Sequence, residues 1–495
     1  MNQLHQRVAV GACCFVALAA MSAAASKRDT FNVADHGARP DDGQVDTAAI
    51  QRTIDAAAKV GGGVVTFPQG TFLTGAIFLR SNVELRLDAG VVLQAIHDES
   101  AYPDMWTRVA GVEMDWPAAV VNVYGQTNVS ITGKGTLDGN GAYWWRKFWG
   151  DDRKGGMLKD YLARDLRWAV DYDCKRVRAL LIYDSKDVQV RDLTIERSGF
   201  WSLTMTYSER VTVDGVIIRA NIGGHGPSSD GIDVDSSRDV LIQNCDIDAN
   251  DDNICLKAGR DADGLRVNRP TENVVIRDCI TRAGYGMFTI GSETSGSIRN
   301  VQVSGMKAIG TKMGIHFKSA KIRGGVVENI SIRDVTMENV ERVISFDLNW
   351  YPAYSLPAIP PELKDASNPP HWAVLLTPVP PERGLPEVRN ISISNVKATG
   401  AKLAFAVNGH PEKPIREVRL TNVAIEAASA GRIQHASDWQ LTNVVIQTAD
   451  GRPFSLTNCH GVELPPVTPS VAPESAVRPP KQKAVPPELS SLARP

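Results

Sequence analysis

The sequence predicts an all-β chain that folds as a right-handed parallel β-helix, a solenoid with an N-terminal capping helix. A short pattern recurs along the chain, in which a polar residue precedes Val or Ile and alternating apolar positions follow. The copies lie 20 to 35 residues apart where no insertion intervenes. Alternation indicates a strand with one inward face, and repetition at this period indicates coils that bury a core only by stacking. Because almost no helix separates the copies, a parallel β-helix is favoured over a propeller or a sandwich. The copies include Asn128-Val129-Ser130-Ile131, Asp187-Val188-Gln189-Val190, Arg210-Val211-Thr212-Val213, Asp239-Val240-Leu241-Ile242, Asn273-Val274-Val275-Ile276, Asn300-Val301-Gln302-Val303, Asn329-Ile330-Ser331-Ile332 and Asn390-Ile391-Ser392-Ile393.

Length and charge restrict the domain organisation and the partners. A chain of 495 residues suits two or three domains, or one large all-β domain with a substantial core. Its 54 Lys and Arg nearly balance its 56 Asp and Glu. This balance excludes a broad basic field for nucleic acid and the extreme acidity typical of disorder. We expect a signal peptide over residues 1–25, one solenoid domain over 26–463 and a Pro-rich tail over 464–495.

The first 25 residues have the composition of a secretory signal peptide. Arg7 precedes an apolar run from Val8 to Ala20, and the small-residue stretch Met21 to Ala25 follows, with cleavage expected near Ala23 to Ala25. Only five residues separate Arg7 from Cys13, too few for the apolar core of a lipoprotein signal. No later apolar run approaches the roughly 20 residues that span a bilayer. We therefore expect an exported chain without a lipid or membrane anchor, in the periplasm or the medium.

The two ends of the predicted solenoid differ. At the N-terminal end, Asp46 to Ala57 has apolar residues at helical spacing, so it can lie across the open first coil. Gly61-Gly62-Gly63 then ends the helix and Val64 begins the sheet. At the other end, residues 464–495 hold nine of the 28 prolines, which indicates an extended, disordered tail.

The cysteines do not indicate a metal site. Cleavage of the signal would leave five: Cys174, Cys245, Cys255, Cys279 and Cys459. An odd number leaves at least one free thiol, and buried thiols packed as small apolar residues are the favoured interpretation. No CxxC or Cys/His zinc spacing occurs, so we expect no structural metal.

Two stretches interrupt the repeat. Residues 100–178 contain six of the ten tryptophans, and residues 349–384 combine Trp350, Tyr351, Tyr354 and Trp372 with many prolines. Aromatic loops on a rigid scaffold could stack on sugar rings. For any single tryptophan, packing of the loop onto the solenoid is the favoured alternative.

Three carboxylates lie about one predicted coil apart. Asp230 belongs to the run 228–233, and Asp251 and Asp252 follow 21 to 22 residues later. If one coil is that long, the three become neighbours in space, and their mutual repulsion then indicates acid–base chemistry or a bound cation. An isolated Asp pair in a solenoid is most often a solvated corner. Asp233 and Asp235 are expected to be such corners or supporting groups.

Several ordered motifs resemble glycoside hydrolase family 28, the polygalacturonase family. The opening resemblance lies in Asn32-Val33-Ala34-Asp35-His36-Gly37-Ala38, Asp46-Thr47-Ala48-Ala49-Ile50 and residues 61–72, Gly-Gly-Gly-Val-Val-Thr-Phe-Pro-Gln-Gly-Thr-Phe. It continues through both aspartate motifs and covers about residues 31–460. The runs 259–264, 269–273 and 290–293 resemble the bacterial exo-acting branch in particular. The resemblance implies a secreted, inverting hydrolase of pectic polysaccharide that uses no cofactor and no metal.

The resemblance also implies roles for the three carboxylates. The family's Asn-Thr-Asp corresponds to Ser228-Ser229-Asp230, and its Gly-Asp-Asp corresponds to Asn250-Asp251-Asp252. Asp251 would be the general acid, and Asp230 and Asp252 would hold and deprotonate the attacking water. An inverting enzyme needs one protonated and one ionised carboxyl, roughly 6.5 to 9.5 Å apart. Adjacent residues of a regular strand point to opposite faces, so Asp251 and Asp252 can share a site only at a bend or a strand end.

The chain departs from the family pattern at two substrate-binding positions. The family's Gly-His-Gly is Gly284-Tyr285-Gly286 here, and its Arg-x-Lys is His316-Phe317-Lys318. Tyrosine is a neutral partner, and histidine lacks the fixed, bidentate grip of arginine on a carboxylate. We expect Tyr285, His316, Lys318 and Lys257 to contact the substrate, with Lys318 and His316 steering an anionic sugar.

Three functions compete on the sequence alone. The favoured one is exo-acting release of galacturonic acid from galacturonan or rhamnogalacturonan oligosaccharides by a monomer, with a family member that cleaves a different pectin-derived sugar as its variant. The second is a β-helix polysaccharide lyase, in which the Asp cluster would hold Ca²⁺. The third is a non-catalytic carbohydrate-binding solenoid.

Overall fold

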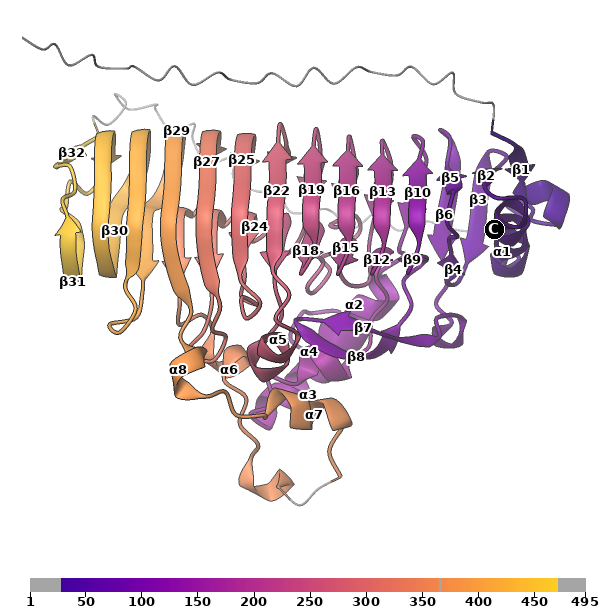
Figure 1. Ribbon diagram of the computed structural model, residues 1–495, viewed down its shortest axis with the longest axis horizontal. Helices are drawn as coiled ribbons and strands as arrows, with labels where there is room; N and C mark the ends of the chain where they lie inside the picture. The colour runs from indigo at the N-terminus through magenta and orange to yellow at the C-terminus, as the bar shows by residue number, and fades with distance from the viewer. Residues whose placement is uncertain (1–27, 365–366, 471–495) are drawn as a thin grey trace, which may run out of the picture.

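The computed structural model describes residues 28–364 and 367–470. Nearly all of its strands form one column of parallel strands, in which each coil of the chain adds a rung (Figure 1). The predicted fold class, a right-handed parallel β-helix, is confirmed. The predicted signal peptide, residues 1–25, lies outside the described residues.

The strands align in three stacks. The first stack consists of β1 (Thr30–Asn32), β2 (Gly63–Thr66), β5 (Val83–Arg86), β10 (Thr127–Thr132), β13 (Lys186–Arg191), β16 (Glu209–Asp214), β19 (Arg238–Gln243) and β22 (Thr271–Arg277), and continues into the long strands β25 (Ile298–Ile309), β27 (Val326–Glu338), β29 (Glu387–Asn408) and β30 (Ile415–Thr448). The second consists of β3 (Gly70–Thr74), β6 (Val91–Ala95), β11 (Thr136–Asp138), β14 (Thr194–Glu196), β17 (Ile217–Arg219), β20 (Asp246–Asp248) and β23 (Ile280–Thr281), and also joins β25. The third consists of β4 (Ile77–Phe78), β9 (Val121–Tyr124), β12 (Leu180–Tyr183), β15 (Leu203–Thr206), β18 (Ile232–Asp235), β21 (Ile254–Lys257), β24 (Gly286–Ile290), β26 (Met313–Lys318) and β28 (Arg342–Asp347). At the C-terminal end, β31 (Ser455–Val462) and β32 (Val467–Pro469) pair with β30.

The polar residue that opens each copy of the repeat has a backbone reason. All eight of these residues adopt the left-handed conformation, with φ between 52° and 57°, as Asn273 (57°) and Asn390 (52°) illustrate. Asn and Asp tolerate this region best among residues with a Cβ. Their side chains also form a ladder between coils, in which Asn300 donates to Asn273 and Asn329 donates to Asn300. The repeat therefore records the turn at which the chain enters each strand of the first stack.

Alternation along the third stack separates core from surface. Ile232 and Val234 of β18 belong to the main hydrophobic core, together with Ile254 and Leu256 of β21. The residues between them therefore point outward, because successive side chains of a strand alternate in direction. These outward positions include Asp233, Asp235, Cys255 and Lys257, and all four are nevertheless buried.

The predicted capping helix is present as α1 (Thr47–Lys59), at the N-terminal end of the column (Figure 1). Its inner face buries Ala49, Ile50, Ile54 and Ala57 against the first coils. At the C-terminal end the predicted boundary needs correction, because β32 lies within the residues assigned to the tail. Regular structure continues to Pro469 instead of ending at 463, and residues 471–495 lie outside the described part of the chain.

The outward face of the third stack is covered by the segments that interrupt the repeat. The first contains η2 (Glu99–Ala101), the antiparallel hairpin β7 (Asp104–Val109) and β8 (Val112–Pro117), and the helices α2 (Ala142–Trp149), α3 (Gly156–Ala163) and α4 (Val170–Asp173). The second contains α6 (Pro352–Ser355), η3 (Pro361–Leu363), α7 (Pro370–Leu375) and α8 (Pro381–Gly384). With α5 (Asp261–Val267), these elements gather on one side of the strand column (Figure 1). The remaining helical turn, η1 (Val33–His36), lies beside α1.

The two insertions pack against each other. The rings of Trp168 and Trp372, one from each insertion, are centred 5.0 Å apart in a shared hydrophobic cluster. The packing interpretation therefore holds for these two tryptophans.

All five cysteines of the described chain are free thiols, and four are buried. Among the described helices, none combines the length and apolar character needed to cross a bilayer.

Candidate active site

Asp230 and Asp252 occupy equivalent places on adjacent coils. Each lies two residues before a strand of the third stack, and β18 and β21 pair in parallel with Ile232 opposite Ile254. The amide of Gly231 donates to the carbonyl of Asp252 over 2.9 Å, which joins the two bends. The prediction that these carboxylates are neighbours in space is confirmed.

Asp251 and Asp252 lie in the bend between β20 and β21, outside regular strand. The backbone amide of Asp252 donates to the carboxylate of Asp251 over 3.0 Å, and the amide of Tyr285 donates to the carbonyl of Asp251 over 2.8 Å. Both carboxylates line one pocket, which adjacent residues can do only at a bend or a strand end. The side chain of Asp252 is fully buried, whereas Asp251 is partly exposed.

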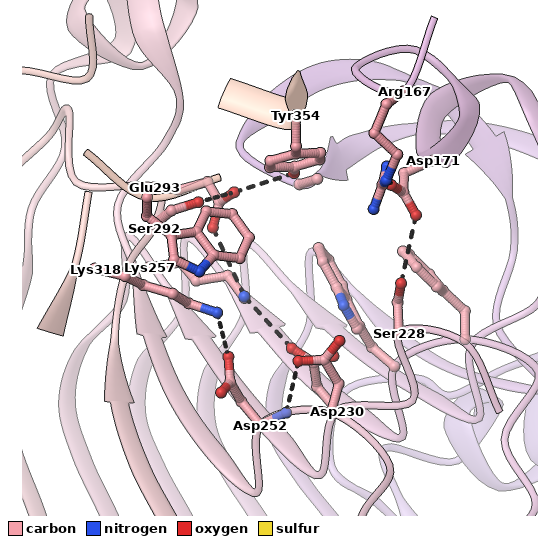
Figure 2. A pocket seen from close by; sticks show the side chains of 15 residues that line it. Arg167, Asp171, Ser228, Asp230, Asp252, Lys257, Ser292, Glu293, Lys318 and Tyr354 are labelled. Atoms are coloured by element: carbon pink, nitrogen blue, oxygen red, sulfur yellow. Dashed lines mark hydrogen bonds and ion pairs between the residues drawn. The ribbon is translucent and has the colours of Figure 1, made fainter. Parts of the chain in front are cut away.

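Asp252 is stabilised as an anion. Lys318 Nζ donates to its Oδ2 over 2.7 Å (Figure 2). The Thr289 hydroxyl donates to its Oδ1 over 2.7 Å. Burial by itself would raise the pKa of this carboxyl, but Lys318 and Lys257 lower it below the usual value. Asp252 is therefore ionised across the ordinary pH range.

Asp251 is shifted in the opposite direction. Desolvation raises its pKa, and the negative charge of Asp252 raises it further, against the weaker influence of Lys318 and Lys257. Two adjacent residues therefore carry opposite tendencies, one toward the carboxylic acid and one toward the carboxylate. This is the pairing that acid–base hydrolysis requires.

Asp230 belongs to a second carboxyl pair. Burial raises its pKa well above the usual value, and the neighbouring Asp233 and Asp251 add to the increase. Asp233 is fully buried and its pKa is raised to about 7, chiefly by burial, with Lys257 opposing. Of the two alternatives expected for Asp233 and Asp235, the solvated corner is wrong and the supporting group fits, since both are buried and Asp235 pairs with the buried Arg108 over 3.1 Å. Both side chains point outward from β18 into a region that the insertions cover.

Lys257 lies at the centre of an acidic cluster. Its ammonium is 3.4 Å from Asp230 and 3.7 Å from Glu293 (Figure 2). It is also 3.4 Å from Asp233. Burial would raise the pKa of Glu293, but Lys257 and Arg323 lower it to about 2. Sequence reasoning quoted Glu293 only as part of a motif and did not assign it to the site. Its separation from the aspartates along the chain gave no signal of this proximity.

The predicted substrate contacts at 257, 285, 316 and 318 have different surroundings. Lys257 and Lys318 line the pocket, and Lys318 Nζ lies 5.7 Å from the ring centre of Tyr285. His316 is 1% exposed and does not line the pocket. Burial and the charge of Lys318 lower its pKa to about 3. The expectation that His316 steers an anion is therefore corrected, since a buried, neutral imidazole supplies no charge.

The insertions supply further pocket residues, of which the sequence had indicated only the aromatic ones. Arg167 and Asp171 come from the first insertion, and Tyr354 comes from the second. Trp350, also from the second, lies with its ring centre 4.6 Å from Lys318 Nζ. The aromatic composition of these loops indicated a sugar-binding role, but only the fold shows which of their residues reach the carboxylates.

The donor set near the aspartates does not fit calcium. Asp230, Asp252 and Cys255 offer ligand atoms within 4.8 Å of one another. Calcium takes about six to eight oxygen ligands, whereas Cys255 offers a sulfur that burial keeps protonated by raising its pKa. Lys318 already donates to Asp252. The cluster therefore lacks the chemistry that the lyase interpretation needs.

Comparisons with known proteins agree with this geometry. The family profile described as "Glycosyl hydrolases family 28" matches residues 64–356, and one described as "Rhamnogalacturonase A/epimerase, pectate lyase-like" matches residues 30–91. A "Probable polygalacturonase" of Vitis vinifera is 27% identical over 434 residues, covering 86% of this chain and 79% of that protein. An "Exo-poly-alpha-D-galacturonosidase" of Dickeya chrysanthemi is 24% identical over 452 residues, covering 84% of this chain and 70% of that protein. The crystal structure of an exopolygalacturonase from Thermotoga maritima superimposes with a TM-score of 0.66 at 29% identity, covering 81% of this chain and 88% of that one.

Proposed function

The chain belongs to glycosyl hydrolases family 28, and from this premise we propose that it is an exo-acting, inverting hydrolase that releases galacturonic acid from pectic oligosaccharides. The observation that carries the proposal is that Asp251 and Asp252 line one pocket, where Lys318 donates to Asp252 and the pKa values of the two carboxyls are shifted in opposite directions. The names of two relatives support the exo assignment, one an exo-poly-alpha-D-galacturonosidase and one an exopolygalacturonase.

Each carboxyl has a role in the proposed reaction. Asp251, biased toward its protonated form, donates a proton to the oxygen of the leaving sugar. Asp252, held ionised by Lys318, takes a proton from the attacking water. Oxygen atoms of Asp230 and Asp252 lie within 4.8 Å of each other, closer than the roughly 6.5 to 9.5 Å that separates acid from base in inverting enzymes. Asp230, whose pKa is raised, therefore lies beside Asp252 and positions the water by hydrogen bonding.

The insertions support cleavage at a chain end. Arg167 and Asp171 border the pocket from one insertion and Trp350 and Tyr354 border it from the other. A site enclosed on these sides admits a terminal sugar more readily than the middle of a long polymer. We also propose that the chain acts as an exported monomer after loss of residues 1–25, with a catalytic domain that reaches to about residue 470.

Defined pectic oligosaccharides test the proposal. The expected product is galacturonic acid of β configuration released from an α-linkage, identified by mass and by the first anomer seen in a proton NMR time course. A rapid fall in polymer viscosity before monosaccharide appears would contradict exo action. Rhamnogalacturonan and side-chain fragments in the same panel determine whether a different sugar is preferred.

The lyase and binding-module alternatives give different results. A lyase product would absorb in the ultraviolet through its new double bond, and a chelator would abolish its formation. Neither is expected here, because the donor set at the aspartates does not suit calcium. A binding module would keep every measurable property after Asp251→Asn, whereas the proposed enzyme loses hydrolysis and keeps its fold.

A further inference from the structure

A uronic acid substrate carries a carboxylate, and three cations line the pocket: Lys257, Lys318 and Arg167. Two of them already neutralise buried carboxylates of the protein. Lys257 lies within 3.7 Å of three of these groups, and Lys318 is 2.7 Å from Asp252. His316, which replaces the arginine expected from the family pattern, is buried outside the pocket. We propose that Arg167, from the first insertion, binds the carboxylate of the uronic acid sugar in the pocket, an inference that rests on the proposed function.

The surroundings of Arg167 leave positive charge available. Its Nη1 donates to Asp171 over 2.5 Å, and Asp171 also pairs with Nη2 of the buried Arg176 over 3.2 Å. One carboxylate therefore faces two guanidinium groups, and this corner of the pocket has an excess of one positive charge. Burial would raise the pKa of Asp171, but Arg167 and Arg176 lower it, so the carboxylate stays ionised. A second anion can enter this corner without meeting an unbalanced negative charge.

The guanidinium of Arg167 is held in place from the second insertion. Its central carbon lies 5.3 Å from the ring centre of Tyr351 and 5.2 Å from that of Tyr354. These contacts use the π faces and occupy none of the five N–H donors. The Arg167 side chain keeps 19% of its area exposed, so the unused donors can reach a ligand.

A buried arginine joins the two insertions at this point. Arg260 donates to the hydroxyl of Tyr172 over 2.6 Å and to the carbonyl of Tyr354 over 2.7 Å. The hydroxyl of Tyr354 in turn donates to Glu293 over 3.3 Å. Arg167 is therefore set against a framework that is ordered before substrate enters, which reduces the entropic cost of binding.

Arg167 also lies on the side of the pocket opposite the aspartates. Figure 2 shows Arg167 and Tyr354 across the pocket from Asp230 and Asp252. A sugar between these groups would direct its glycosidic carbon toward the aspartates and its carboxylate toward the guanidinium. Arginine suits this task because its planar fork matches a carboxylate in bidentate geometry.

The test compares the free acid with its neutral ester. For each variant, kcat/KM is measured on trigalacturonic acid and on its fully methyl-esterified form, and the ratio of the two values is the readout. A hydrogen bond to a charged group contributes about 1.5–3 kcal/mol, so Arg167→Gln is expected to lower the acid-to-ester ratio about 10- to 150-fold. Arg164→Gln is the matched control, because Arg164 is exposed on the same segment and stands outside the pocket lining. Its ratio should equal that of the wild type.

The outcomes separate this inference from the proposed function. If the wild type releases neither galacturonic acid from the free acid nor methyl galacturonate from the ester, the proposed function fails and the inference fails with it. If the wild type is active and Arg167→Gln keeps the wild-type ratio, the inference alone is overturned. Circular dichroism establishes that the variant is folded. If the glutamine variant does not fold, Arg167→Lys replaces it, because lysine keeps the charge but loses the bidentate fork. An acid-to-ester ratio lowered about 3- to 10-fold then supports the assignment, and an unchanged ratio refutes it.

Discussion

Replacing Lys318 with methionine tests the electrostatic basis of the proposed reaction. Lys318 Nζ lies 2.7 Å from Asp252 Oδ2, and both side chains are at least nine-tenths buried. Methionine keeps most of the side-chain stem and removes the ammonium, so the main influence that lowers the pKa of Asp252 is lost. Because Asp252 must be ionised to take a proton from water, the acidic limb of the pH–rate profile moves to higher pH.

The size of the shift follows from the geometry. An opposite charge within about 4–6 Å lowers a carboxyl pKa by about 1–3 units, and each unit is worth about 1.4 kcal/mol. The acidic limb of kcat/KM should therefore move upward by about 1 to 3 pH units in Lys318→Met. Stability should fall as well, by about 3–5 kcal/mol at neutral pH, because Asp252 is left as an unpaired buried charge. A carboxyl with a lowered folded-state pKa stabilises the fold above its unfolded pKa, so this loss shrinks as the medium is acidified toward pH 4 and below.

Initial rates of galacturonic acid release across the pH range provide the assay, and urea unfolding at pH 4 and pH 7 provides the stability comparison. Lys312→Met is the matched control. Lys312 is exposed, and its Nζ lies 5.5 Å from the ring centre of Tyr285 without an ion pair to Asp252. If Lys318→Met lowers the rate by one constant factor at every pH and leaves the acidic limb in place, Lys318 acts on the substrate and not on Asp252, and the argument is refuted.

Three further changes follow from the same geometry. Asp251→Asn should lower kcat by about 10²–10⁴-fold while the thermal unfolding transition remains, since the general acid is removed; a variant that keeps wild-type kcat would exclude Asp251 from that role. His316→Leu should change kcat/KM less than about tenfold and leave the pH profile unshifted, because the buried imidazole is neutral; a larger, pH-dependent loss would restore a direct role for His316. The pKa of Asp233 is raised to about 7 in the folded protein. Its carboxyl therefore contributes most to the free energy of unfolding at a pH below the pKa that it has in the unfolded chain, and this contribution is lost as the pH rises through about 7. Asp233→Asn should therefore reduce the fall in unfolding free energy between pH 4 and pH 7, at about 1.4 kcal/mol per pKa unit, and an unchanged slope in urea titrations would contradict it.

The solenoid could be predicted because its determinants are local. Each copy of the repeat places a polar residue, Asn or Asp in seven of the eight, in the left-handed conformation before a strand with one apolar face, and both features are visible in the sequence. The parallel register of Ile232 with Ile254 then follows from the coil length, and it brings Asp230 beside Asp252. The extent of regular structure near the C-terminus was harder to predict, because β32 forms within a Pro-rich segment whose composition resembles that of a tail.

The burial of each side chain could not be predicted from local sequence patterns in the same way. Asp233 and Asp235 read as turn residues, yet they are buried, because insertions distant in the chain cover the outward face of β18. His316 occupies the family's arginine position but is buried and does not line the pocket. No local pattern records what a loop more than a hundred residues away places over a strand.

The sequence by itself therefore determined the repeating fold and the proximity of the three carboxylates, because each depends on spacing along one coil or between adjacent coils, and its ordered motifs indicated the family. Only the tertiary structure decided how the charges are shared. Lys318 keeps Asp252 ionised, Lys257 divides its charge among Asp230, Asp233 and Glu293, and Arg167 enters from an insertion. Protonation and charge pairing depend on distance and desolvation in three dimensions, and these are set by how the insertions fold back onto the solenoid.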